Sequence, residues 1–288
     1  MKSTTILILS FFIIILSSCD DKSIEEIDND VSFNKEITED HKIALLRAGV
    51  NPIGAEYINV NHLDGNLLKV IRSGDLALSV KYLENGLYSL HEDDQFVNKQ
   101  YRTFNLVSQG RTINVIGYTG SGYALTSKMR TGLQWAINNY NNLNLSLQFN
   151  LTFAARTDGD IVIYNAGGSS SGGLADFPSN GRPGKFIQIY GGMNNYSNNV
   201  NEHVMTHEIG HALGLRHTDY ARRRCGGANE QDSNEGIQAG ARHIPGTPTA
   251  NRWGQSGLDT DSIMISCFDG TEDGEFSRFD RIALEYLY

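Results

Sequence analysis

The chain has 288 residues, of which 40% are hydrophobic, so it is long enough for one sizeable domain and a smaller appendage. Its formal net charge of −9 argues against nucleic acid as a partner. No internal apolar run is long enough to cross a bilayer, which argues against a membrane-spanning domain.

The N-terminus has the pattern of an export signal. Lys2 supplies a positive charge, an apolar run follows at residues 6–16, and we therefore predict a signal peptide over residues 1–18. The letters LSSC at residues 16–19 resemble a bacterial lipobox, in which Cys19 is lipidated; an ordinary signal with an incidental cysteine is the alternative. A lipid on Cys19 would hold the protein on a membrane without spanning it. We therefore expect an exported protein of the outer membrane or cell surface, which maturation could release.

A polar stretch and a small segment come next. Residues 19–40 are acidic and predict a flexible tether. Asp20 and Asp21 also resemble surface-export signals of some Gram-negative bacteria, and an ordinary acidic linker is the alternative. Residues 41–104 predict a small separate segment with a helix at 42–48 and short strands.

Residues 105–288 predict a larger domain of mixed helices and strands. Alternating apolar residues predict strands at 112–118 and 145–153, and two further strands are predicted at 161–164 and 185–190. Residues 127–140 predict a helix whose apolar residues lie mostly on one stripe: Met129, Leu133, Trp135, Ala136 and Ile137. The Gly- and Ser-rich run at 167–184 predicts a long loop without helix or strand. It holds Asp176, a candidate Ca²⁺ ligand, although we favour a flexible rim without an ion.

Two further helices are predicted towards the C-terminus. One spans residues 199–213, where Glu202 is an acidic residue expected to favour the helix N-terminus. The other begins after Ser277, a good N-cap with Asp280 three positions on.

The most informative residues lie on and just after the first of these helices. His207 and His211 are four apart, so they project from one helix face and can share a metal ion. Glu208 lies beside them, Gly214 permits a sharp turn, and the turn can bring His217 to the same ion. Three protein ligands with one open position are the arrangement of a catalytic zinc site. An amphipathic helix with incidental histidines is the alternative, but HExxHxxGxxH is far more specific than HExxH alone.

These residues resemble the metzincin zinc peptidases, whose signature adds a methionine turn downstream. Residues 262–264, Ser-Ile-Met, match that turn and place Met264 beneath the metal. Together with HEIGHALGLRHTDY at 207–220 and HIPGT at 243–247, they are similar to the bacterial dual-action HEIGH metallopeptidases, relatives of the astacins. The resemblance covers roughly residues 100 to 288.

The resemblance implies an α+β fold. Its parts are a twisted, mostly parallel sheet with an antiparallel edge strand, a backing helix, the active-site helix, the Met-turn and a C-terminal helix, all preceded by a pro-segment. It also implies that the strand before the zinc helix, residues 185–190, forms the rim along which an extended substrate binds. Astacins carry a tyrosine two residues after the turn methionine; Ser266 stands there and argues against a tyrosine ligand.

The resemblance further implies a zymogen. In this family and in astacins, a Gly-Asp before an apolar residue supplies a carboxylate that blocks the zinc, and Gly74-Asp75-Leu76 resembles that element. The residues before it depart from the usual form, and a surface turn is the alternative. Asp75 is therefore the candidate latency switch.

Cys225 and Cys267 form an even pair in a chain predicted to be exported. Such a pair favours a disulfide, which would link the segments that follow the zinc helix and the turn methionine. Two buried thiols are the alternative.

The function expected from these residues is zinc-dependent cleavage of proteins or peptides by a monomer. One Zn²⁺ would activate water, and Glu208 would take its proton and pass it to the leaving amine. Asp219 would orient a zinc ligand or cap the next turn, and Tyr220 would pack in the interior. A non-catalytic surface lipoprotein that binds extracellular polymers is the alternative from another class, and Glu208 argues against it. A peptidase restricted to one target protein is a third reading.

Overall fold

The computed structural model describes residues 36–86, 101–225, 228–229 and 242–288. The predicted signal peptide, the lipidation of Cys19 and most of the predicted tether lie outside the described residues. The chain divides into two compact units, residues 1–32 and 33–288, and every element below belongs to the second. Within the described ranges, no helix has the length and apolar character needed to span a membrane.

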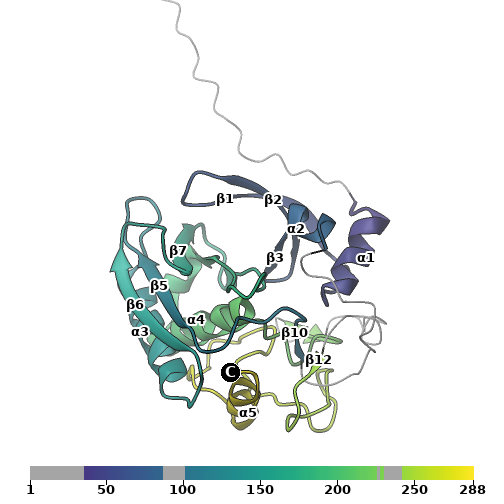
Figure 1. Cartoon of the computed structure of the whole chain (residues 1–288). Helices are drawn as coiled ribbons and strands as arrows, with labels where there is room; N and C mark the ends of the chain where they lie inside the picture. The colour runs from purple at the N-terminus through teal and green to yellow at the C-terminus, as the bar shows by residue number, and fades with distance from the viewer. Residues whose placement is uncertain (1–35, 87–100, 226–227, 230–241) are drawn as a thin grey trace, which may run out of the picture. The chain divides into compact units, whose positions relative to one another are not determined.

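A five-stranded sheet forms the centre of the larger domain (Figure 1). Its spatial order is β6 (Gln148–Ala154), β5 (Thr112–Tyr118), β7 (Ile161–Gly167), β9 (Phe186–Tyr190) and β8 (Gly173–Leu174). The first four strands are parallel, and β8 pairs antiparallel with β9. The predicted mostly parallel sheet with one antiparallel edge strand is therefore confirmed.

The edge strand differs from the one expected. Residues 186–190 lie inside the sheet, between β7 and β8, so they do not form its rim. The rim is β8, which lies in the Gly- and Ser-rich run predicted to contain no strand. A strand of one glycine and one leucine has no periodicity to detect, and it forms because its backbone pairs with Gln188 and Ile189.

Helices α3 (Ser127–Asn141) and α4 (Asn198–Leu213) pack against each other and against the sheet (Figure 1). Thr126 and Ser197 cap their N-termini through side-chain oxygens. The two helices approach closely at Gly132, where an added Cβ would lie 2.7 Å from the backbone of α4. Trp135, placed on the apolar stripe by the sequence, is instead 37% exposed; the buried stripe is formed by its neighbours Leu133, Ala136 and Ile137.

Glu202 does not lie in the first turn of α4, because the helix begins at Asn198. Its side chain is buried and accepts a hydrogen bond from Asn139 Nδ2 at 2.8 Å, so the predicted helix-dipole role is wrong and the residue joins α4 to α3.

Helix α4 ends before Gly214, whose φ of 105° is the left-handed conformation that glycine adopts readily.

The C-terminal helix α5 (Arg278–Leu287) is fastened to the centre of the domain. Ser277 and Asp280 form the capping box expected at its start. The buried Asp280 carboxylate also accepts hydrogen bonds from Ser262 Oγ at 2.6 Å and Ile263 N at 2.8 Å. The hydroxyl of Tyr288 donates to the Leu213 carbonyl, so α5 fixes both the turn before Met264 and the end of α4.

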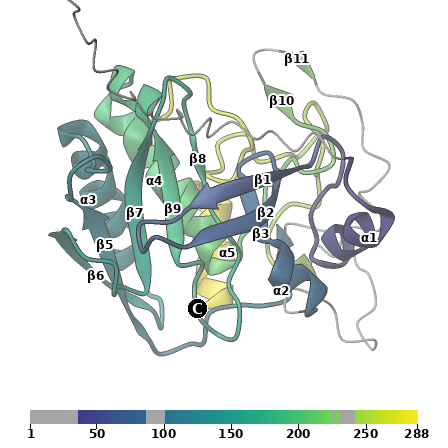
Figure 2. The ribbon, with the colours of Figure 1, turned by 90° about the horizontal axis from the view of Figure 1, so that it is seen from above.

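The segment before the larger domain has its own small sheet and core. It consists of α1 (Glu39–Arg47), β1 (Glu56–Asn61), β2 (Leu67–Ser73), β3 (Leu76–Ser79) and α2 (Val80–Glu84), with the three strands antiparallel in the order β1-β2-β3. Helix α1 begins three residues before the predicted helix, inside the predicted tether, because Thr38 caps it. Figure 2 shows the β1–β2 hairpin crossing in front of the larger sheet, and the His62 ring lies on Phe186 of β9 with centroids 4.3 Å apart.

Short pairs of strands and one short helix complete the described elements. They are β4 (Tyr101–Arg102) with β12 (Arg242–His243), β10 (Arg224–Cys225) with β11 (Ala228–Asn229), and the 3-10 helix η1 (Gly191–Asn195) before α4.

Candidate metal centre

Three histidine side chains converge at one point beside β8. His207 and His211 lie one turn apart on α4, and the turn at Gly214 brings His217 back to them. The Nε2 atoms of His211 and His217 are 3.1 Å apart, and those of His217 and His207 are 3.3 Å apart. A tetrahedral zinc ion with bonds of about 2.0–2.1 Å holds its nitrogen ligands about 3.3–3.4 Å apart. The spacing therefore fits a shared zinc ion.

Backbone carbonyls orient two of these rings. His207 Nδ1 lies 2.7 Å from the Ile263 carbonyl oxygen, and His211 Nδ1 lies 2.9 Å from that of Leu215. An Nδ1–H that donates to a carbonyl leaves the Nε2 lone pair free for a metal. All three histidines are buried, so the donor set is preorganised by the fold.

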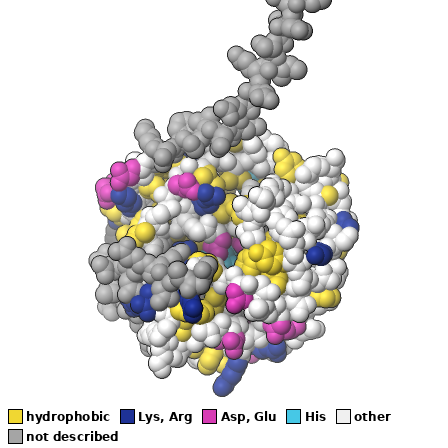
Figure 3. Space-filling view, turned by 180° about the vertical axis from the view of Figure 1, so that it is seen from behind, with side chains coloured by type: hydrophobic (Ala, Val, Ile, Leu, Met, Phe, Trp, Pro, Cys, Tyr) yellow, Lys and Arg dark blue, Asp and Glu magenta, His cyan; other side chains and the backbone are white. Residues whose placement is uncertain are grey.

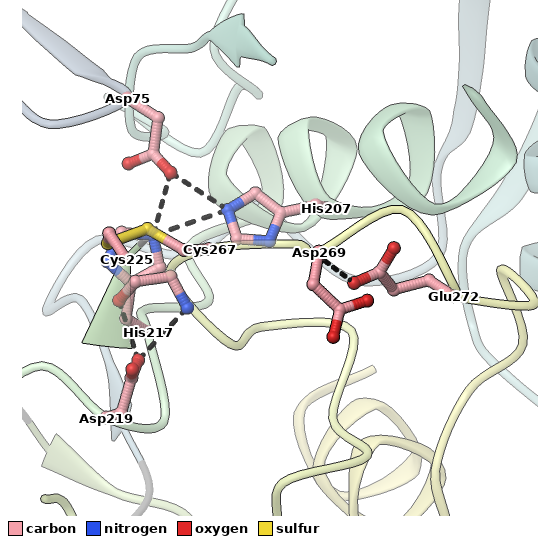
Figure 4. Close-up of a disulfide and its surroundings, with 9 residues drawn as sticks. Asp75, His207, His217, Asp219, Cys225, Cys267, Asp269 and Glu272 are labelled. Carbon is pink, nitrogen blue, oxygen red and sulfur yellow. Dashed lines mark hydrogen bonds and ion pairs between the residues drawn. A yellow bond between two sulfur atoms is a disulfide. The ribbon is translucent and has the colours of Figure 1, made fainter. Parts of the chain in front are cut away.

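The carboxylate of Asp75 occupies the fourth side of this cluster (Figure 4). Its Oδ2 lies 3.0 Å from His217 Nε2 and 3.2 Å from His207 Nε2, and its Oδ1 lies 3.6 Å from His211 Nε2. Burial alone would raise the pKa of Asp75, but His217 and hydrogen bonds from the histidine rings hold that pKa well below its usual value. The carboxylate is the form of this side chain that binds zinc.

The turn between β2 and β3 aims Asp75 at the histidines. Gly74 has a φ of 65°, and an added Cβ would lie 2.6 Å from a guanidinium nitrogen of Arg223. Asp75 O accepts from Ala175 N at 3.0 Å, and Ala77 N donates to Ala175 O at 2.8 Å. Residues 75–77 thus pair with Ala175, the residue directly after β8.

Glu208 lies next to the cluster without joining it. Its side chain is buried, and Oε2 has no hydrogen-bond partner among the described residues. Burial, and secondarily the charge of Asp75, raise the pKa of Glu208 well above its usual value. Space for its carboxyl group exists because residue 173 is glycine, where a Cβ would lie 2.6 Å from Oε1. Glu208 and Asp75 both line a cavity of about 410 Å³.

Met264 packs beneath the histidines. It is buried, and its sulfur would lie 2.6 Å from a Cβ added to Gly210, which lies between His207 and His211 on α4. Its carbonyl accepts from Thr218 N at 2.9 Å, directly after the third histidine. The methionine segment therefore supports the helix and the returning chain together.

Asp219 does not hold a histidine ring as expected. Its Oδ1 accepts from Ser266 N at 3.0 Å and from Ser266 Oγ at 2.6 Å. It therefore ties the segment after His217 to the segment after Met264. Tyr220 is buried, as predicted, and its hydroxyl accepts from Asn251 Nδ2 at 3.1 Å.

A disulfide joins Cys225 to Cys267, with Cα atoms 5.3 Å apart (Figure 4). Both cysteines line the cavity that contains Glu208. The bond links the two segments that frame the histidines, and it closes a loop with a sequence separation of 42 residues.

Replacing Cys225 and Cys267 by alanine together should lower the free energy of unfolding by about 3–4 kcal/mol, because a loop of this length loses that much closure entropy when it is cross-linked. Urea unfolding of the oxidised wild type and the double variant measures the difference. Reduction of the wild type with a phosphine should give the same loss, and coincident unfolding curves for all three samples would contradict the prediction.

Glu202 should make stability depend on pH. Burial first, and then Glu275 and Asp273, raise its pKa from 4.5 to about 7. The folded chain therefore holds this proton more tightly than the unfolded chain, so the contribution is full below about pH 4.5 and is lost as the pH rises through about 7. Glu202→Gln should be more stable than wild type by about 1–2 kcal/mol at pH 8 and nearly equal at pH 4.5. Urea unfolding of both proteins at pH 4.5 and pH 8 tests this, and an equal difference in stability at the two pH values would refute it.

The described part of the chain contains one group of side chains arranged to share an ion, formed by Asp75 and the three histidines. Sequence reasoning named all four and Glu208. It missed Gly173, which makes room for Glu208, and Arg223, which covers Gly74. Neither had a sequence signal, because both act through contacts between distant segments.

Comparison with known proteins agrees with this geometry. The family model described as the dual-action HEIGH metallo-peptidase matches residues 72–288. A search of curated proteins gave no match. Among solved structures, two of myroilysin are similar to this chain. The first is 16% identical, and the match covers 60% of this chain and 78% of that chain with a TM-score of 0.36. The second is 19% identical, and the match covers 70% of this chain and 95% of that chain with a TM-score of 0.38. The family match alone shows that the chain belongs to the dual-action HEIGH metallo-peptidases and is a zinc metallopeptidase.

Proposed function

We propose that this metallopeptidase is an exported endopeptidase made in a latent form, with Glu208 as its general base and Asp75 as its inhibitory ligand. The observation that carries the proposal is the closed cluster itself: three histidine nitrogens and one carboxylate oxygen from the pro-segment, beside a buried glutamate whose Oε2 has no described partner. A catalytic zinc site keeps one position open, so the carboxylate stands where water would otherwise bind.

The residues divide the chemistry between them. His207, His211 and His217 would hold a zinc ion, which supplies Lewis acidity to a bound water and to the scissile carbonyl. Glu208 would accept a proton on its free Oε2 and return it to the leaving nitrogen. The raised pKa of Glu208 suits the second of these transfers, because a carboxyl group that retains a proton near neutral pH is a better acid in the later step. Gly173 makes room for the carboxyl group beside β8, because a Cβ there would lie 2.6 Å from Glu208 Oε1.

Strand β8 offers an edge for an extended peptide. In the latent chain, residues 75–77 pair with Ala175 at the end of that edge, at distances of 2.8 and 3.0 Å. Removal of the pro-segment would free both the edge and the fourth metal position. A substrate could then add to the sheet through its backbone, which favours cleavage within extended chains.

Export and lipidation belong to the same proposal. The sequence supports them through its leader and Cys19, and the Cys225–Cys267 disulfide supports an oxidising location outside the cytoplasm. We place the protein at the outer membrane or cell surface, anchored by lipid and released on maturation, with proteins or peptides as substrates.

The test uses the chain from residue 20 onwards, with its zinc content measured. Hydrolysis of casein and of a quenched peptide is followed before and after limited proteolysis. We expect about one zinc per chain, little hydrolysis before trimming and clear hydrolysis after it, which a chelator abolishes. Stoichiometric zinc without hydrolysis on either substrate, trimmed or untrimmed, would overturn the proposed endopeptidase.

A further inference from the structure

A second cavity of about 820 Å³ continues from the one that contains Glu208. The two cavities share four lining residues, His203, Ile265, Cys267 and Phe268. None of the described residues that line the second cavity belongs to the predicted pro-segment. Figure 3 shows acidic and histidine side chains inside a hollow of the surface, with more acidic side chains beyond it.

The second cavity is strongly acidic, and we call it the acidic groove. Its lining includes five carboxylates: Asp261, Asp269, Glu272, Asp273 and Glu275. Among the described residues that line it, Arg224 is the one arginine or lysine, and its guanidinium lies 5.6 Å from the centre of the Trp253 ring. The negative charge extends outside the groove, because Asp273 and Glu275 add to the effect of burial in raising the pKa of Glu202.

These carboxylates are not arranged to share a metal ion. Glu272 accepts hydrogen bonds from the backbone N atoms of Asp269 and Gly270, at 2.6 and 3.0 Å, and Asp273 accepts one from Glu275 N at 3.0 Å. No ion-sharing group of side chains occurs in the groove among the described residues. The spread of charge over a long groove suits extended cationic side chains better than a compact ion.

His203 provides an independent sign of a ligand. It lies one turn before His207 on α4, is only 7% exposed and lines both cavities. No hydrogen bond joins its ring to another described residue, and its ring nitrogens are not among the atoms sealed in the interior, so the ring faces the cavities that it lines. A group that enters between the two cavities would supply a hydrogen-bond partner.

We propose that the acidic groove binds lysine or arginine side chains of the substrate and so selects peptides with a basic residue near the scissile bond. This rests on the proposed peptidase function. The His203 and His207 rings have centroids 6.3 Å apart, and an extended peptide advances about 3.3 Å per residue, so a side chain within a few residues of the cleaved bond reaches the groove. An ammonium or guanidinium group would donate to His203 and face the carboxylates.

The first test measures binding to the full chain in its latent form. The probes are two fluorescent peptides of equal length, one with two lysines and one with glutamines in their place. The groove variant carries Asp261→Asn and Glu275→Gln, two exposed residues. The matched control carries Asp158→Asn and Glu285→Gln, which change the net charge equally but do not line the groove.

We expect the lysine peptide to bind more tightly than the glutamine peptide, and the groove variant to reduce that preference by roughly 3- to 10-fold. The control should keep it. Equal binding of the two peptides, or an equal loss in the control variant, would overturn the proposal, because the attraction would then come from net charge alone.

The second test profiles a peptide library cut by the trimmed chain. Enrichment of lysine or arginine at one position, reduced in the groove variant and kept in the control, supports the proposal. Hydrolysis without such enrichment overturns it and leaves the proposed function standing. A trimmed chain that cuts no peptide overturns the proposed function itself, and the role of the groove in substrate choice with it.

Discussion

Glu208→Gln should lower the kcat/KM of peptide hydrolysis by roughly 10²- to 10⁴-fold in the trimmed chain without loss of zinc. Glutamine has the same shape as glutamate, so it fits the space that Gly173 leaves beside it. The amide takes no proton at neutral pH, and the three histidines that hold the ion are unchanged. Zinc analysis and initial rates on one quenched peptide measure both parts of the prediction.

The control for Glu208→Gln is Glu285→Gln, the same change at an exposed residue of α5. It should leave both zinc content and rate unaltered. A Glu208→Gln chain that keeps its full zinc and hydrolyses the peptide at the wild-type rate would exclude Glu208 as the base. Loss of zinc together with activity would instead assign it a structural role.

Asp75→Asn should raise hydrolysis by the untrimmed chain at least about tenfold, since about 1.4 kcal/mol of lost carboxylate binding already gives that factor. The neutral amide is a poorer zinc ligand than a carboxylate, while the pairing of residues 75–77 with Ala175 uses backbone atoms and remains. Rates for untrimmed and fully trimmed samples of wild type and variant give the degree of latency.

Asp64→Asn is the matched control, because Asp64 lies in the turn between β1 and β2 and its Oδ1 accepts from Asn66 N at 3.1 Å, as an asparagine oxygen can. It should remain latent. The contrary result is that Asp75→Asn hydrolyses the peptide no faster than wild type before trimming and at an equal rate after it. Coverage of the cleft by the whole pro-segment, rather than the Asp75 carboxylate, would then keep the enzyme latent.

The metal centre was predictable because its chemistry is local in sequence. Three ligands and Glu208 lie within eleven residues, and the helix period and one glycine fix their relative positions. Asp75 is 132 residues from His207, and no periodicity joins them; it was identified only through resemblance to a family. The parallel sheet was expected on the same ground, and the apolar pattern located four of its strands, two of them by alternation.

Three of the predictions were wrong because the residues concerned depend on contacts between segments that are distant in the sequence. Strand β8 has two residues and depends on pairing with β9, so local pattern carries no information about it. Asp219 was assigned from its distance along the chain to His217, but its partner, Ser266, lies 47 residues away. Glu202 is buried because α3 and α4 approach closely at Gly132, a tertiary contact that local pattern does not encode. Trp135 was misassigned, because helical spacing turns it away from the face that carries Leu133, Ala136 and Ile137.

The apolar core formed by residues 37–83 includes Phe177, a residue of the larger domain, and His62 lies on Phe186. A single cut between the two parts would therefore leave them bound without a covalent link. Release then becomes a dissociation governed by mass action, favoured by dilution and opposed by high protein concentration. Activation would thus consist of cleavage followed by escape of the cleaved fragment, and a freshly cut sample should gain activity on dilution before any second cut occurs.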